Sequence, residues 1–262
     1  MGIAISKTVE QKPSRVVWSV SPEGLRLYAY LWFWGLVIVG ALLTLNYSHV
    51  DYEHNPIFDV FGYNNICVFF DTFPANYVLP AIWVVNLVIF LAYIVTSWIR
   101  VYHRYVFSLT TRGRFIFYTI STAIEGLGLI VFTTVFSVPP EDSMAVHLLP
   151  FTFLILSLSL LSVKNFAYYR AVLDLGRTEI WLGYVYLVVH LSVSIAKMIM
   201  QVNLLMGDPL YDTLAFVGFH QFTDRVWMVT AALLPIFFAL RYRKRAPKLV
   251  FSEQMLSESI PA

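Results

Sequence analysis

Six apolar runs, each at least 20 residues long, constrain this chain more than any other feature. They cover residues 27–47, 77–98, 115–138, 144–163, 180–200 and 213–240. A helix needs about 20 apolar residues to cross a bilayer, and a backbone inside lipid must satisfy its own hydrogen bonds. With 58% hydrophobic and only 13% charged residues, a soluble fold is disfavoured. The sequence therefore predicts an all-α polytopic membrane protein, a bundle of six transmembrane helices.

The basic residues indicate how this bundle is oriented. Of the 18 Lys and Arg residues, sixteen lie before the first run or in the stretches after the second, fourth and sixth runs, whereas the other three gaps hold none. An excess of basic residues marks the cytoplasmic side of a membrane protein. We therefore expect both termini in the cytoplasm. Because the membrane explains the basic clusters, nucleic acid is not expected as a partner.

The gaps between the runs define the predicted organisation. Residues 1–24 are polar and are expected to form a loose cytoplasmic tail, residues 25–245 a membrane domain, and residues 246–262 a second cytoplasmic tail. The long gap at residues 48–74 is rich in aromatic, acidic and turn-forming residues, which favours a packed external cap over the bundle. At the N-terminus, Gly2 followed by Ser6 fits the N-myristoylation pattern, so Gly2 is a candidate lipidation site.

Seven ionisable side chains lie inside the predicted spans, where charge is costly and by default marks a functional site. His220 and Asp224 are four residues apart and therefore share one helical face. Similar polar stripes occur on spans three to five, so we expect a shared polar interior near the external ends of the helices. The seven residues are Glu125, His147, His190, Lys197, His220, Asp224 and Arg225.

Several chemistries fit this set. Asp224 could orient His220 as a general base, while Lys197 or Arg225 holds an anionic phosphate. A purely structural pairing of Asp224 with Lys197 or Arg225 is the alternative. The spacing of His, Cys and acidic residues within the spans matches no metal-binding motif, and no cofactor fingerprint occurs, so neither a metal nor a cofactor is expected.

The stretch at residues 123–147 resembles one known family. It runs Ala-Ile-Glu-Gly-Leu-Gly-Leu-Ile from Ala123, and continues through the acidic turn Glu141-Asp142 to His147. This arrangement is similar to the FRAG/DRAM/SFK family of six-span proteins, which includes a post-GPI-attachment lipid-remodelling factor and the damage-regulated autophagy modulators. Asn55-Pro56 also resembles the first external segment of the autophagy modulators. The likeness departs at residues 58–61, where Phe-Asp-Val-Phe replaces the family's Pro-x-Ile-Ser run.

The resemblance implies a lipid-handling protein of endomembranes, in the Golgi or endoplasmic reticulum, with the plasma membrane or lysosome as alternatives. Its partner would be the lipid of a GPI anchor or a related phospholipid. If the protein is an enzyme, acyl transfer at the luminal membrane edge fits best. In that interpretation His147 is the base, supported by Glu125 and the His220–Asp224 pair, with Lys197 or Arg225 on a phosphate.

Two other functions remain open on the sequence. One is a non-catalytic regulator or scaffold of a membrane complex, related to autophagy or phosphoinositides, whose basic tails recruit membrane-protein partners. The other is a proton-linked transporter that uses Glu125, His190 and Asp224 as a relay.

Overall fold

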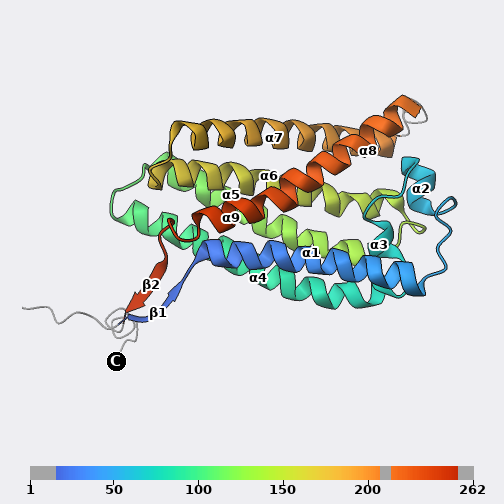
Figure 1. The fold of residues 1–262 in the computed structure, drawn as a ribbon, viewed down its shortest axis with the longest axis horizontal. Helices are drawn as coiled ribbons and strands as arrows, with labels where there is room; N and C mark the ends of the chain where they lie inside the picture. Colours follow the sequence, from blue (N-terminus) through green and yellow to red (C-terminus); the bar gives the residue numbers. More distant parts are fainter. Residues whose placement is uncertain (1–15, 207–213, 253–262) are drawn as a thin grey trace, which may run out of the picture.

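The computed structural model describes residues 16–206 and 214–252, so Gly2 lies outside the described residues. It confirms the predicted all-α fold. Six helices are long and apolar enough to cross a membrane, and they lie roughly side by side along the long axis of the molecule (Figure 1). The helices extend beyond the apolar runs by several residues, because polar and charged side chains near their ends also adopt helical structure.

The spans are single helices or continuous helical stretches. They are α1 (Pro22–Tyr47), α4 (Ala75–Val106), α5 (Arg112–Phe132) continued by the 3₁₀ turn η1 (Thr133–Phe136), α6 (Met144–Val172), α7 (Arg177–Met206), and α8 (Leu214–Met228) continued through η3 (Val229–Leu233) into α9 (Leu234–Tyr242). Ser21, Thr111 and Ser143 cap the starts of α1, α5 and α6, each by accepting a backbone N–H in the first turn.

The segment η3 is a π-helical turn that interrupts the last span. Pro235 follows it, and a proline has no N–H to donate and clashes with the carbonyl four residues earlier, so the wider turn accommodates it. Neighbouring side chains use the backbone oxygens there. Tyr186 donates to the oxygen of Thr230 at 3.2 Å, and Trp34 to that of Ala232 at 3.3 Å. These bonds tie the last span to α7 and α1.

The two described tails meet at one end of the bundle. Strand β1 (Val16–Val20) precedes α1 and pairs antiparallel with β2 (Leu249–Ser252), with an irregularity between Val16 and Trp18 (Figure 1). The expectation of a loose N-terminal tail is therefore wrong for residues 16–20, because valine and aromatic residues in both segments favour strand pairing. The pairing also shows that both ends of the membrane domain leave the bundle on the same side.

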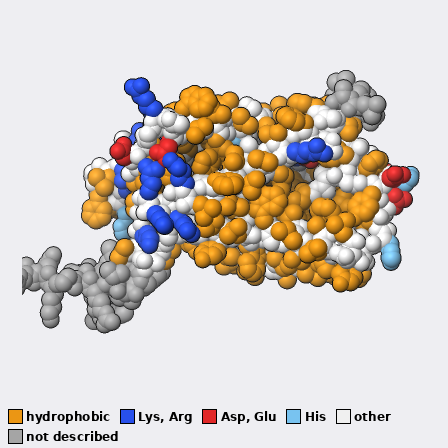
Figure 2. All heavy atoms as spheres, viewed as in Figure 1, with side chains coloured by type: hydrophobic (Ala, Val, Ile, Leu, Met, Phe, Trp, Pro, Cys, Tyr) orange, Lys and Arg blue, Asp and Glu red, His pale blue; other side chains and the backbone are white. Residues whose placement is uncertain are grey.

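Charge separates along the long axis of the molecule. Most of the basic side chains on the face in Figure 2 gather at the end that carries β1 and β2, with a few acidic ones among them. Acidic and histidine side chains lie at the opposite end, and the surface between the ends is mostly hydrophobic, apart from one basic patch. This distribution is the one that six membrane-crossing helices require, since lipid must contact apolar atoms.

The cap predicted at residues 48–74 packs on the end opposite the strands. It contains two short helices, α2 (Pro56–Phe61) and α3 (Val68–Asp71) (Figure 1). Its buried side chains form a cluster with Leu148 of α6, namely Ile57, Phe61, Tyr63, Cys67 and Val68. The cap therefore packs on the ends of the helices through apolar side chains and is not a solvated loop.

Replacing Gly128 by alanine should destabilise the packing of α5 against α6. The added Cβ would lie 2.0 Å from Ser157 Oγ and 2.9 Å from the backbone oxygen of Phe153, both too close. We expect a loss of about 1–3 kcal/mol of stability, seen as a lower melting temperature in detergent. Gly126→Ala is the matched control, because its nearest neighbour would be Leu91 Cδ2 at 3.7 Å. Equal effects of the two variants would contradict this close approach.

Candidate functional site

The cap directs one polar side chain down into the bundle. Asn55 caps α2 by accepting the N–H of Phe58 at 3.0 Å, and Gly62 ends that helix with a φ of 71°, a conformation that favours glycine. The amide of Asn55 also donates to Asn64 Oδ1 at 2.8 Å, which closes the turn. The chain reverses there, so that the buried ring of Tyr63 lies against α8.

A cavity of about 410 Å³ lies beneath the cap, between it and helices α1, α6, α7 and α8. Part of its lining is apolar and includes Trp34, Phe61, Leu148, Phe151, Ile155 and Trp227. Part is polar and includes Tyr63, Lys197, Gln201, His220, Asp224 and Arg225. The two kinds of side chain adjoin, since Phe61 lies against His220 and Lys197 lies over Trp227. An amphipathic cavity of this size suits a ligand with a polar end and an apolar body.

A hydrogen-bond network connects several of the polar side chains that line the cavity. The Tyr63 hydroxyl donates to Asp224, and Lys197 Nζ donates to the other oxygen of the same carboxylate. The Tyr63 oxygen also lies 2.7 Å from His220 Nδ1. The sequence-based expectation that His220 and Asp224 share a face is met, but a tyrosine from the cap lies between them. The predicted pairing of Asp224 with Lys197 also occurs, so that charge pair contributes to structure as well as to the cavity wall.

This network assigns the protons on His220. Tyr63 has one hydroxyl hydrogen, and it is used on Asp224, so the hydrogen between Tyr63 and His220 must come from Nδ1 of the histidine. Nε2 of His220 then carries a lone pair, and it has no protein hydrogen-bond partner among the described residues. His220 lines the cavity, and although Nε2 is itself buried, its lone pair can accept a proton from a hydroxyl that reaches it.

Burial keeps two cap groups at the cavity neutral. It raises the pKa of the Tyr63 phenol and of the Cys67 thiol above their ordinary values. A thiol is a poor nucleophile when it is protonated, so burial disfavours Cys67 as a reactive group of the cavity.

His147 does not line the cavity. Its Nδ1 lies 2.9 Å from the backbone oxygen of Val138, and its Nε2 lies 3.3 Å from Asp71 Oδ2, so both ring nitrogens face groups of the protein. Burial raises the pKa of Asp71, while the neighbouring imidazole of His147 opposes that rise. This pair fastens the end of α3 to the start of α6 beside the cavity.

Glu125 is also separate from the cavity. It is buried in α5 and accepts a hydrogen bond from Lys164 of α6, which also donates to Thr122 at 3.0 Å. His190 lies elsewhere in the bundle, with Nδ1 3.0 Å from the Thr230 hydroxyl. Of the predicted site residues, the structure thus brings together Lys197, His220, Asp224 and Arg225, and leaves Glu125 and His147 in two other pairs.

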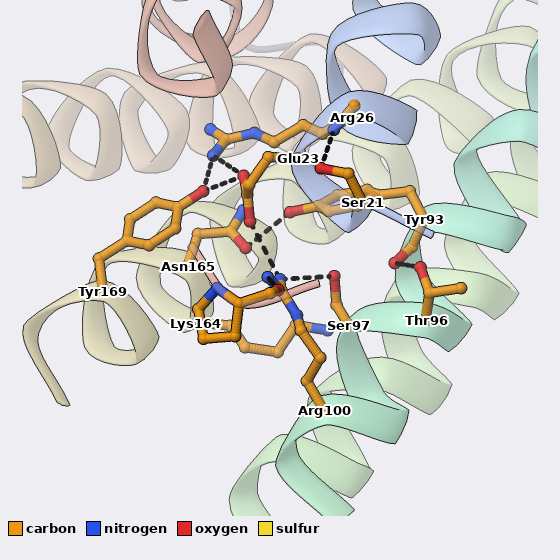
Figure 3. Close-up of polar contacts among 12 residues, drawn as sticks. Ser21, Glu23, Arg26, Tyr93, Thr96, Ser97, Arg100, Lys164, Asn165 and Tyr169 are labelled. Atoms are coloured by element: carbon orange, nitrogen blue, oxygen red, sulfur yellow. Dashed lines mark hydrogen bonds and ion pairs between the residues drawn. The ribbon is translucent and has the colours of Figure 1, made fainter. Parts of the chain in front are cut away.

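A further buried ion cluster occupies the end near the strands (Figure 3). Glu23 of α1 accepts from Arg100 of α4 at 3.0 Å and from Tyr169 of α6, and lies 3.8 Å from Arg26. Arg26 donates to the Tyr169 oxygen at 2.8 Å. All four side chains are buried.

This cluster corrects one part of the charge interpretation. On sequence, Arg26, Arg100 and Lys164 count among the basic residues outside the apolar runs. The structure instead buries all three inside helices. Hydropathy could not reveal this, because Arg100 and Lys164 are paired with acids on other helices. The signal that sequence reasoning overlooked was Glu23, an acidic residue at the start of a span, three residues before Arg26.

Among residues 16–206 and 214–252, no group of three or more His, Cys, Asp or Glu side chains is arranged to hold a metal ion. Comparison with known proteins identifies no relative: no family model matches the chain, and neither a curated protein nor a solved structure matches it.

Proposed function

We propose that this protein binds a phospholipid in the cavity beneath the cap and handles the lipid part of a GPI anchor or a related phospholipid. The amphipathic cavity is the observation that carries the proposal. The apolar side chains that line it suit the first part of an acyl chain, and the polar ones suit the phosphate and glycerol. The resemblance of residues 123–147 to the GPI-anchor remodelling family favours an anchor lipid.

The distribution of basic residues indicates on which side of the membrane the cavity lies. The basic end of the bundle, with both tails, would face the cytoplasm, which places the cavity at the luminal edge of an endomembrane such as the Golgi or endoplasmic reticulum. Arg225 is exposed, lines the cavity and has no acidic partner among the described residues, so it is the best placed contact for a lipid phosphate. Lys197 supports it from beside Asp224.

If the reaction is acyl transfer, His220 is the best placed base. Its Nε2 would accept the proton of an attacking hydroxyl as that oxygen bonds to the acyl carbon, and would return the proton to the oxygen that leaves. Asp224 would act through Tyr63 to hold the histidine in the required tautomer. We prefer His220 to His147 for this role, because His147 lies outside the cavity, with Nδ1 beside Val138 and Nε2 beside Asp71.

Filling the cavity tests the proposal without removing a charge. Val229 lines the cavity and is 44% exposed, so Val229→Trp should occupy the space with little strain. The native chain and the variant would each be expressed in cells that lack the native protein, and the acyl composition of anchor lipids would be measured by mass spectrometry. We expect the native chain to restore that composition and Val229→Trp not to restore it. Val202→Trp is the control, because Val202 is 49% exposed and does not line the cavity.

His220→Gln then separates binding from chemistry. An enzyme should lose remodelling in this variant but still crosslink to a photoreactive lipid, whereas a regulator should keep both properties. Normal anchor lipids with Val229→Trp, at a protein level equal to that of the control, would contradict the proposed function.

A further inference from the structure

A second cavity lies at the opposite end of the bundle, near the strands. It has a volume of about 370 Å³ and lies between α4, the turn that follows it, α5 and α6. Three arginines line it, Arg104, Arg114 and Arg170, together with Thr110 and the two tyrosines Tyr118 and Tyr168. We call this the basic groove. It belongs to a different end of the molecule from the cavity beneath the cap.

The charge of the basic groove is unbalanced. No carboxylate lines it, and among the described residues none of its three arginines forms an ion pair with an acid. Arg104 donates to the backbone oxygen of Leu109 at 3.2 Å, and Arg170 bonds to the Tyr184 hydroxyl. Those partners are neutral. Tyr184 belongs to α7, which does not line the groove, so Arg104 and Arg114 supply most of its positive charge. Residues that only set membrane topology have no need to converge in this way.

An adjoining hollow extends the same charge. It has a volume of about 300 Å³, shares Arg104 and Tyr168 with the basic groove, and adds Arg100, His103 and Lys248. Arg100 is committed to Glu23, but Lys248 is exposed and has no acidic partner among the described residues. Residues 247–250, which include the start of β2, line this adjoining hollow.

The surroundings of the basic groove point to a lipid rather than a free anion. Phe117 lines it and is 38% exposed, and apolar side chains nearby are also exposed, including Val106 at 56% and Leu109 at 61%. A head group bound by the arginines would therefore leave its acyl chains against an apolar surface. Basic pockets between membrane helices on the cytoplasmic side bind such head groups.

We propose that the basic groove binds a phospholipid whose head group carries more than one negative charge. Arginine is suited to this, because its planar guanidinium makes paired hydrogen bonds to phosphate oxygens. A zwitterionic lipid, or one with a single phosphodiester, would leave most of the charge in the groove unneutralised. A phosphomonoester on the head group supplies the charge that is missing.

Binding to the purified full-length protein in nanodiscs tests this inference. Discs of phosphatidylcholine would contain either phosphatidylinositol monophosphate or unphosphorylated phosphatidylinositol, and bound lipid would be counted by native mass spectrometry. We expect retention of the phosphorylated lipid only. Removal of one arginine should weaken it about fivefold, and the double variant Arg104→Gln/Arg114→Gln more than tenfold. The control is Arg177→Gln/Arg243→Gln, which removes the same charge from exposed positions outside the groove.

A second variant guards against loss of folding. Thr110→Glu keeps every arginine and adds a negative charge at the groove, so it should also weaken binding, whereas Thr178→Glu at an exposed position outside the groove should not. Equal retention by the groove variants and their controls would overturn the inference. So would tight binding of a water-soluble inositol phosphate with no retention of the lipid. Failure here would leave the cavity beneath the cap, and its own test, unaffected.

Discussion

Glu23→Gln is expected to destabilise the protein strongly, although residue 23 lies far along the bundle from the cavity beneath the cap. The carboxylate of Glu23 is fully buried and is the acid that Arg26 and Arg100 share. Glutamine keeps the shape but removes the charge, so two guanidinium groups would remain buried without an anion. Breaking a buried ion pair by removing one partner typically costs about 3–5 kcal/mol. For a chain of this size we expect the melting temperature in detergent to fall by about 10 °C.

Glu179→Gln is the matched control for this variant. Its carboxylate also accepts from two arginines, Arg241 and Arg245, but these side chains are 59% and 38% exposed. Exposed ion pairs are worth about 0–1 kcal/mol, so the control should shift the melting temperature little. If both variants lowered it equally, the burial of the Glu23 cluster could not be the source of its stability.

The second large effect is expected at the pair formed by Glu125 and Lys164. Each side chain is almost fully buried, and each is the charged partner of the other. Glu125→Leu alone, or Lys164→Met alone, leaves one uncompensated charge and should cost about 3–5 kcal/mol. The double variant replaces the pair by apolar side chains of similar size and should recover most of that loss. Melting temperatures of the native protein, both single variants and the double variant form the complete cycle.

The same double variant decides whether Glu125 has a role beyond this pair. Neither residue lines the cavity beneath the cap, so under the proposed function a double variant that folds should still remodel anchor lipids. A stable double variant without remodelling would assign Glu125 to the chemistry. If the single losses simply added in the double variant, the two charges would not be coupled in the way that the structure shows.

The polar residues show how far the helical pattern predicts a site. The shared face of His220 and Asp224 followed from their spacing, because residues four apart on a helix lie one above the other. Lys197 was correctly placed toward the interior for the same reason, and it meets Asp224. Tyr63 could not be assigned, because it reaches His220 from a loop 157 residues earlier in the chain.

The sequence by itself determined the six helices, the alternating direction of successive helices, and the separation of a basic from an acidic end. Those features are local, since each span must satisfy its own backbone in lipid and each basic flank acts on its own span. Only the tertiary structure decided which charges meet. The rotation and order of the helices put Glu23 against Arg100, put Glu125 against Lys164, and separated His147 from the cavity. These charge pairs depend on contacts between distant segments, and hydropathy averaged along one segment carries no information about them.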